Sequence, residues 1–229
     1  MITRRLFLGA ASLAALSGCT SLSSRETPRT EPVKPRLQTM PAAYGPITDE
    51  PYPIEAVPRG VVPKRFWRQR VPNPFPNEAP GTLIVDPGTF YLHLVEEGGT
   101  AMRYGIGVGR QGFSWSGNAV VQYKRKWPRW KAPDDMVARN PSLAPYSVAN
   151  GGMDPGPLNP LGARALYLFQ NGQDTLYRIH GNPEANSIGK AVSSGCIRLL
   201  NHDIIDLYDR VRNGAKVVVK QAGMPASMA

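Results

Sequence analysis

Short runs of β-branched, aliphatic and aromatic residues recur from residue 82 onward, and these runs predict strands. Two of them, 82–86 and 89–95, flank Asp86-Pro87-Gly88, a turn sequence that predicts a β-hairpin. Further strands are expected at 101–108, 119–123, 165–169, 175–180 and 215–220. Because short strands dominate, we expect a mostly β fold, a sandwich or barrel-like domain with minor helix.

One segment near the C-terminus has the periodicity of a helix. It begins at Asn201, a residue type that favours helix N-caps, and Asn213-Gly214 supplies a stop. Apolar residues with helical spacing lie between them: Ile204, Leu207, Tyr208 and Val211.

The first residues have the pattern of an export signal. Residues 1–5 are basic, and the apolar stretch 6–16 is too short to span a bilayer comfortably. Residues 3–8 resemble a twin-arginine signal, and Leu16-Ser17-Gly18-Cys19 resembles a bacterial lipobox. We therefore expect residues 1–19 to direct export to the periplasm and Cys19 to carry a lipid anchor in the membrane. A signal peptide cleaved nearby, leaving a secreted protein, is the alternative.

Proline usage divides the rest of the chain. Residues 20–80 contain 13 of the 23 prolines and little regular alternation, so they cannot form a packed domain alone. We expect a Pro-rich flexible tether at 20–49 and an irregular segment at 50–79 whose apolar residues dock on the following domain. The folded domain is expected at 80–221, followed by a C-terminal tail at 222–229.

Composition and charge narrow the class of protein. The 229 residues are 41% hydrophobic and 19% charged, which is typical of a globular chain. Two cysteines and three histidines give neither a disulfide framework nor a Cys-rich zinc site, so we expect no metal and no cofactor. His93, in an alternating strand, and His202, at a helix start, are expected to be structural.

The net charge of +10 includes a basic run at 124–131 with Trp127 and Trp130 interleaved. Such a run can bind single-stranded nucleic acid by stacking bases between cations. Export argues against that partner, because an exported protein meets an anionic cell-wall polymer instead. We therefore expect no nucleic acid, and a solvated loop with two core tryptophans is the alternative.

Reactive residues concentrate between residues 180 and 199. His180 ends a predicted strand, and Cys196 follows sixteen residues later, after a glycine-containing loop. A cysteine, with an ordinary pKa of about 8.5, becomes an effective nucleophile when a neighbouring imidazole takes its proton. A buried structural cysteine beside an unrelated histidine is the alternative. However, Ser193-Ser194-Gly195-Cys196 is hardly a core sequence, and a cysteine in an oxidising compartment is a liability unless it is buried or used.

This segment resembles the signature of the YkuD-type L,D-transpeptidases. The resemblance rests on His180-Gly181 and on Ser193-Ser194-Gly195-Cys196-Ile197-Arg198-Leu199. Blocks at 104–110, 115–117, 126–130, 157–164 and 165–168 are similar to family blocks in the same order. The resemblance covers about residues 80–221 and implies a YkuD-like catalytic domain, a cysteine acyltransferase that acts on peptidoglycan stem peptides.

The resemblance also implies the roles of the catalytic residues. Cys196 would attack the carbonyl of the third stem residue, release the terminal D-alanine and hold the donor as a thioester. His180 would be the base, with its ring oriented by the backbone carbonyl of Gly181.

Other implied site residues surround the cysteine. Backbone N–H groups of Ser194 and Gly195 are the expected oxyanion donors. Ser193 and Arg198 are the expected substrate-binding residues, because a guanidinium forms bidentate pairs with a carboxylate. The alternative for Arg198 is an intramolecular salt bridge.

Two positions depart from the common family pattern. Ser194 stands where many members have a second histidine, so a two-histidine mechanism is not expected, and Asn182 replaces the commoner threonine. The acceptor amine has no readable motif. It comes from another stem, giving 3-3 cross-links, or from an envelope protein, while water would make an L,D-carboxypeptidase. A catalytically silent, lipid-anchored peptidoglycan-binding tether is the alternative from another class.

Overall fold

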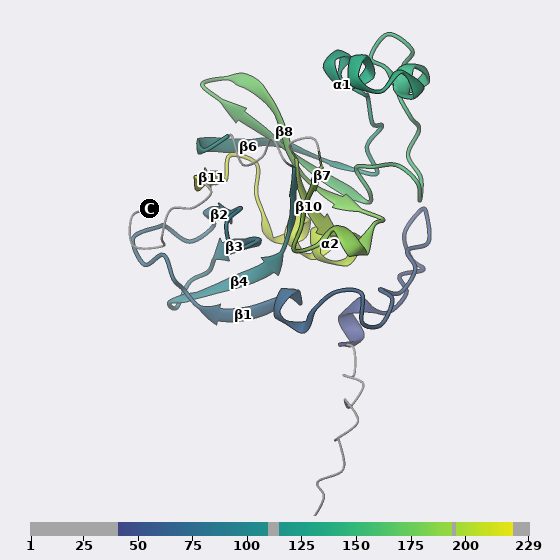
Figure 1. The fold of residues 1–229 in the computed structure, drawn as a ribbon. Coiled ribbons are helices and arrows are strands. Elements are labelled where there is room, and N and C mark those ends of the chain that lie inside the picture. The colour runs from purple at the N-terminus through teal and green to yellow at the C-terminus, as the bar shows by residue number, and fades with distance from the viewer. Residues whose placement is uncertain (1–40, 110–114, 194–195, 222–229) are drawn as a thin grey trace, which may run out of the picture. The chain divides into compact units, whose positions relative to one another are not determined.

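The computed structural model describes residues 41–109, 115–193 and 196–221. These residues form one sheet of eleven strands with two α-helices and four short 3-10 helices (Figure 1). The predicted mostly β fold with minor helix is therefore confirmed. In the described ranges, no helix is long and apolar enough to cross a membrane.

The sheet joins strands that are far apart in the sequence. Three neighbouring pairs are parallel, namely β2 (Leu83–Asp86) with β11 (Lys216–Val219), β8 (Gln173–Asn182) with β10 (Ile197–Leu200) and β5 (Gly107–Gly109) with β9 (Ala191–Ser193), and the others are antiparallel. In sheet order the strands are β1 (Gln69–Pro72), β4 (Thr100–Gly105), β3 (Tyr91–Val95), β2 (Leu83–Asp86), β11 (Lys216–Val219), β6 (Gly117–Lys126), β7 (Arg164–Gln170), β8 (Gln173–Asn182), β10 (Ile197–Leu200), β5 (Gly107–Gly109) and β9 (Ala191–Ser193).

A single main core takes side chains from nine of these strands, so the sheet curls around it (Figure 1). Helix α2 (Asn201–Arg210) adds Ile204 and Leu207, both fully buried. In β8 and β10, Ile179, Ile197 and Leu199 face this core. Because side chains alternate across a strand, the residues between them face away from the core.

The hairpin predicted around Asp86-Pro87-Gly88 is present. Strands β2 and β3 pair antiparallel, and Asp86 Oδ1 accepts a hydrogen bond from the Thr89 backbone N–H at 3.2 Å. All the expected strands are found within a few residues of their predicted bounds. The expected strand 101–108 is divided at Ile106, whose N–H bonds to Phe90 O, and its second part pairs on the far side of the sheet. Short strands β1, β9 and β10 and the helix α1 (Asp134–Arg139) were not predicted.

The predicted helix exists, but its start was misread. Leu200 is the N-cap residue, and Asn201 is the first residue of α2. The Asn201 side chain does not cap the helix, because its Oδ1 accepts a hydrogen bond from the Ala163 backbone N–H at 3.0 Å. At the other end the helix stops at Arg210, before the predicted Asn213-Gly214 signal.

Residues 41–68, which we call the N-terminal clasp, pack against the sheet domain. The tether expected at 20–49 is therefore wrong over residues 41–49, because Tyr44 is 2% exposed and lies in a cluster with Val57 and Phe66 of the clasp and Leu200 of β10. The clasp and the strands belong to one compact unit. Its contact is close: a Cβ added to Gly105 would lie 2.5 Å from Phe66.

Polar contacts fasten the clasp to α2. The Tyr44 hydroxyl accepts a hydrogen bond from the Arg68 N–H at 2.6 Å and donates to Asp203 Oδ2 at 3.4 Å. Arg68 Nη1 lies 3.7 Å from Asp203 Oδ1 and 3.4 Å from Asp206 Oδ1. His202 Nε2 lies 2.7 Å from the Gly45 carbonyl oxygen.

A second set of contacts joins the clasp to the root of an arm, residues 127–163, that carries α1 away from the sheet (Figure 1). Glu50 accepts from Trp127 Nε1 at 2.8 Å and from Arg164 Nη1 at 2.9 Å. The Tyr52 ring packs on the Trp127 ring with centroids 4.9 Å apart. The clasp therefore bridges α2, the arm and the sheet.

Candidate active site

His180 lies on β8, which pairs in parallel with β10. The register places His180 opposite Arg198 and Asn182 opposite Leu200. Continuing this register one residue before β10 places Cys196 opposite Arg178. These residues share the face that points away from the main core, because the alternate residues Ile179 and Ile197 point into it. The topology thus brings the predicted base and nucleophile to one face of two adjacent strands.

The His180 side chain is buried at 3% exposure, and its Nδ1 lies 2.6 Å from the Gly181 carbonyl oxygen. Since a carbonyl oxygen only accepts, Nδ1 carries the proton and Nε2 is the basic nitrogen. Burial lowers the pKa of His180 to about 4; the Gly181 and Pro160 carbonyls oppose this shift, and the charges of Arg198 and Arg178 reinforce it. The imidazole is therefore neutral at neutral pH.

Gly181 has no room for a side chain. A Cβ there would lie 2.3 Å from Asn201 Oδ1 and 2.9 Å from Ile204 Cγ2. The Asn201 side chain is held in this place by its bond with Ala163, so the first turn of α2 presses directly on the peptide that orients His180. Asn201 was predicted only as a cap, and sequence spacing alone could not assign it this position.

Cys196 is half-buried, directly before β10. Burial raises the pKa of its thiol, whereas a hydrogen bond from the Arg178 backbone and the charges of Arg178 and Arg198 act in the opposite direction. With the thiol pKa raised and that of His180 lowered, both the Cys196 thiol and the His180 imidazole are neutral at neutral pH.

Two guanidinium groups lie at the Cys196 end of this face, and each of them is paired with a carboxylate. Arg198 Nη1 lies 3.3 Å from Glu184 Oε2, so the predicted salt-bridge alternative is present in the resting structure. Glu184 is 66% exposed, and such a surface pair contributes only about 0 to 1 kcal/mol, so a substrate carboxylate can replace it. Arg178 forms a bidentate pair with Asp174 at 2.6 and 2.7 Å. Arg178 was not predicted as a site residue, although a residue two positions before His180 on a strand shares its face.

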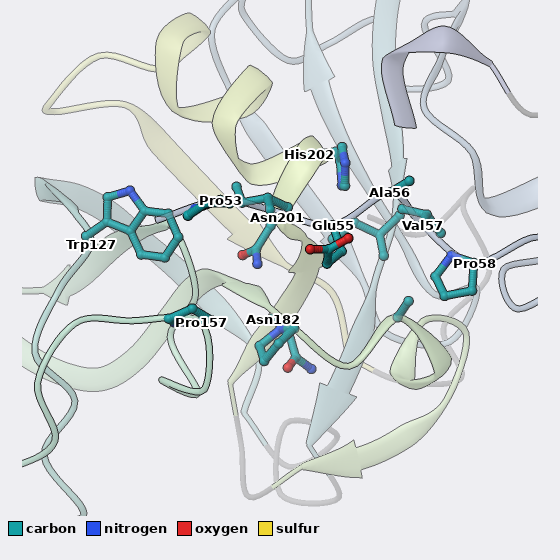
Figure 2. A pocket seen from close by; sticks show the side chains of 14 residues that line it. Pro53, Glu55, Ala56, Val57, Pro58, Trp127, Pro157, Asn182, Asn201 and His202 are labelled. Carbon is teal, nitrogen blue, oxygen red and sulfur yellow. The ribbon is translucent and has the colours of Figure 1, made fainter. Parts of the chain in front are cut away.

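A cavity of about 220 Å³ lies where the clasp passes over the ends of β8 and β10 (Figure 2). We call it the clasp pocket. One wall is the clasp segment 53–58, and the opposite wall carries the Asn182 and Asn201 amides and the Trp127 ring (Figure 2). The residues that line it are Pro53, Ile54, Glu55, Ala56, Val57, Pro58, Trp127, Pro157, Asn182, Pro183, Ala185, Leu200, Asn201 and His202.

Several predicted site residues lie outside the described residues. These are Cys19, Ser194 and Gly195, and only the backbone of Ser193, at the end of β9, is described. Their predicted roles in lipidation, oxyanion binding and substrate binding stay predictions.

The other two histidines are packed into the structure. His93 is 7% exposed between the Phe75 and Tyr91 rings, and His202 is 5% exposed against the clasp. In the basic run, Trp127 is buried against the clasp, whereas Trp130 pairs with Met153 within the arm.

Together, these features define a class of protein, namely β domains with a candidate cysteine acyl-transfer site. The features are the mostly β fold, the parallel strand pair, and a cysteine and a histidine on one face of that pair. The comparison with family models identifies it further. Residues 80–219 match YkuD, the L,D-transpeptidase catalytic domain, and the chain belongs to this family. The predicted recognition is therefore confirmed.

Curated relatives agree with this assignment. The chain is 31% identical over 194 residues to the probable L,D-transpeptidase ErfK/SrfK of Escherichia coli K12, over 80% of this chain and 58% of the relative. It is 31% identical over 140 residues to the probable L,D-transpeptidase YbiS of the same organism, over 59% of this chain and 43% of that protein. The chain thus spans about half the length of these curated relatives.

Solved structures are also similar. A Brucella melitensis crystal structure, described as a probable carnitine operon oxidoreductase, is 47% identical over 69% of this chain and 96% of its own, with a TM-score of 0.48. An L,D-transpeptidase from Mycobacterium smegmatis is 18% identical over 61% of this chain and 58% of its own, with a TM-score of 0.44.

Proposed function

We propose that this protein is an L,D-transpeptidase that acts on peptidoglycan stem peptides through a thioester on Cys196. The observation that carries the proposal is the arrangement of His180. Its Nδ1–H is held by the Gly181 carbonyl, which leaves Nε2 as the base on the same strand face as Cys196. The family match supplies the reaction class.

In the first half-reaction, Cys196 Sγ attacks the carbonyl carbon of the third stem residue while His180 Nε2 takes the thiol proton. The S–C bond forms, the C–N bond to the terminal D-amino acid breaks, and His180 returns the proton to the departing amine. The pKa values fit this order, because a histidine with a pKa of about 4 stays neutral until the attacking thiol supplies its proton.

In the second half-reaction, an acceptor amine attacks the thioester carbon. The new C–N bond forms, the C–S bond breaks, and the amine proton passes through His180 to the Cys196 sulfur. A second stem peptide as acceptor gives a 3-3 cross-link, and an envelope protein becomes attached to the cell wall. Water in place of the amine gives L,D-carboxypeptidase activity.

The test is incubation of the purified protein with a disaccharide tetrapeptide stem, followed by mass spectrometry of both protein and products. We expect an acyl adduct on the wild type, none on Cys196→Ala, and at least a hundredfold slower acylation of His180→Ala. His93→Gln is the matched control, because His93 is also buried with a pKa lowered to about 4 but lies on β3. It should acylate at the wild-type rate.

The products separate the alternatives. A cross-linked dimer or a peptide conjugate indicates transpeptidation, and a free tripeptide stem indicates carboxypeptidase activity. Stem binding without any adduct on Cys196 would support the silent peptidoglycan-binding tether and contradict the enzyme.

We further propose that the protein is an exported lipoprotein anchored through Cys19 in the periplasm. The support is the lipobox Leu16-Ser17-Gly18-Cys19 directly after a basic and apolar leader. Cys19→Ser should move the protein from the membrane to the soluble periplasmic fraction with unchanged turnover. A wild-type protein that is soluble after export would contradict the anchor.

A further inference from the structure

We propose that the clasp pocket is the docking site of the acyl acceptor, a peptide that carries a cationic side chain about four residues from its attacking amine. This inference rests on the proposed function, because it assigns the second substrate of that reaction. The position of the pocket, the residues that line it and the charge of Glu55 support it.

The pocket lies further along the same strand face as the candidate catalytic pair. Asn182 is two residues beyond His180 on β8, and Leu200 is four residues beyond Cys196 on β10. At about 3.3 Å per residue, the Cys196 thiol and the pocket are about 13 Å apart along the strand. An acceptor that reaches both places is therefore an extended chain of about four residues, and a single amino acid is too short.

The lining is suited to a peptide. Carboxamides supply the donors and acceptors that a peptide backbone needs, and proline rings and the Trp127 indole supply apolar walls. The Asn182 amide is held rigid, since Nδ2 donates to Ser187 Oγ at 3.0 Å and Oδ1 accepts from the Glu184 N–H at 3.0 Å. Its second N–H is left for a ligand. Asn201 uses Oδ1 for Ala163, and its NH₂ group faces the pocket (Figure 2).

The two ends of this face differ in their charged groups. Arg178 and Arg198, each paired with a carboxylate, lie at the Cys196 end, whereas Glu55 is the one charged residue among the described residues that line the pocket (Figure 2). His202 is neutral there, because burial lowers its pKa. Within the described chain, the Glu55 carboxylate has no ion pair or hydrogen bond. A donor stem brings carboxylates, which suit the two guanidinium groups, and an acceptor brings amines, which suit Glu55.

The clasp supplies Glu55 and lies outside residues 80–219, which the family model matches. The acceptor preference inferred here therefore rests on a segment that the catalytic-domain model does not include. A purely structural role for Glu55 is that of a negative charge beside the first turn of α2, and such a charge would affect stability without affecting the choice of acceptor.

The test compares two acceptors in competition, Gly-Ala-Ala-Ala-Arg amide and Gly-Ala-Ala-Ala-Gln amide. Both attack through the N-terminal amine, and the arginine guanidinium is not a nucleophile. With a tetrapeptide donor in excess, mass spectrometry gives the ratio of the two conjugates. We expect the wild type to prefer the arginine peptide by about three- to tenfold at low salt, and the preference to shrink in 0.5 M NaCl.

Three variants locate the preference. Glu55→Gln should abolish it, Glu55→Asp should retain it, and the matched control Glu97→Gln, an exposed carboxylate in the turn after β3, should leave it unchanged. Acylation of Cys196 by a carbapenem should be equal in all four proteins, since only the second half-reaction is altered. Equal use of both peptides by the wild type, or an undiminished preference in Glu55→Gln, would overturn the inference. Preferred transfer to a second stem peptide in the wild type and in Glu55→Gln alike would do the same.

Failure of the proposed function gives a different result. If Cys196 is never acylated, the proposed reaction is wrong, and the pocket is then tested by binding alone. Fluorescence anisotropy with the labelled arginine peptide and Cys196→Ala should show binding that Glu55→Gln weakens. Equal affinity for the arginine and glutamine peptides would refute the pocket independently of the chemistry.

Discussion

Asp203 is a fully buried carboxylate at the junction of the clasp and α2, and Asp203→Asn should change the stability of the protein in a pH-dependent way. Burial raises the pKa of Asp203 to about 7 against an ordinary value of 3.8, although Arg68 and the Tyr44 hydroxyl oppose the shift. The folded protein therefore takes up a proton near pH 7 that the unfolded chain takes up only near pH 4.

The sign and size of the effect follow from this difference. Above pH 7 the buried charge lowers the free energy of unfolding, and that cost is removed as the pH falls and the folded state is protonated. Each pH unit below the folded pKa is worth 1.36 kcal/mol, so the wild type gains about 2 to 3 kcal/mol between pH 7 and pH 5. Asparagine does not titrate, and the Asp203→Asn variant lacks this gain.

The assay is urea denaturation of both proteins at pH 5, 6, 7 and 8. The stability of Asp203→Asn relative to the wild type should fall by about 2 to 3 kcal/mol from pH 8 to pH 5. The stability of the variant must be compared with that of the wild type at each pH, because the three histidines also titrate. His93, His180 and His202 have lowered pKa values, so their contribution to stability is lost as the pH falls below about 6.5.

Asp206→Asn is the matched control on the same helix. The pKa of Asp206 is lowered, with hydrogen bonds from Arg210 and Tyr104 outweighing the cost of burial. Its stabilising charge is therefore lost only below about pH 4, and the difference between this variant and the wild type should be flat from pH 5 to pH 8. A flat difference for Asp203→Asn as well would show that the Asp203 carboxylate is not held in the protonated form by burial.

Three other substitutions test the site and its support. Gly181→Ala should lower the free energy of unfolding by about 1 to 3 kcal/mol, because the added Cβ collides with Asn201 Oδ1. The turnover rate should fall more steeply than substrate affinity, and unchanged kinetics would contradict the role of the Gly181 peptide in orienting His180. Glu50→Gln removes the counter-charge of Arg164, whose side chain is 4% exposed, and should lower the free energy of unfolding in urea by about 3 to 5 kcal/mol. A loss below about 1 kcal/mol would mean that the pair is solvated. Arg198→Lys keeps the charge but loses the planar fork, so kcat/KM should fall roughly tenfold to a hundredfold while thiol labelling persists, and wild-type kinetics would remove this residue from the site.

The sequence predicted the strands well because their burial alternates or is continuous over several residues. The contact between His180 and Gly181 was predicted only from the family resemblance. The structure agrees with that prediction, because His180 Nδ1 lies 2.6 Å from the Gly181 carbonyl oxygen. Strand β10 was not predicted because Ile197–Leu200 is only four residues long, three of them apolar, and lies directly before a helix. Local pattern does not distinguish so short a segment from a helix start.

The clasp shows a different limit of sequence reasoning. Its buried residues Tyr44, Val57 and Phe66 follow no period, because an irregular segment follows the surface on which it packs. The Asn201 prediction is wrong for a related reason, since the side chain of this good N-cap residue instead accepts a hydrogen bond from the N–H of Ala163, directly before β7. Local propensity was overridden by a tertiary contact in both cases.

Strand β11, the last in the chain, lies between β2 and β6 in the middle of the described sheet. During synthesis, the strands on both sides of β11 in the sheet exist before β11 itself. Folding to the native sheet therefore waits for residues 216–219, and pairing β2 with a strand more than a hundred residues away makes the final step slow. A chain cut before Lys216 would keep β8 and β10 on one side of the missing strand and β4, which pairs with β1 directly after the clasp, on the other.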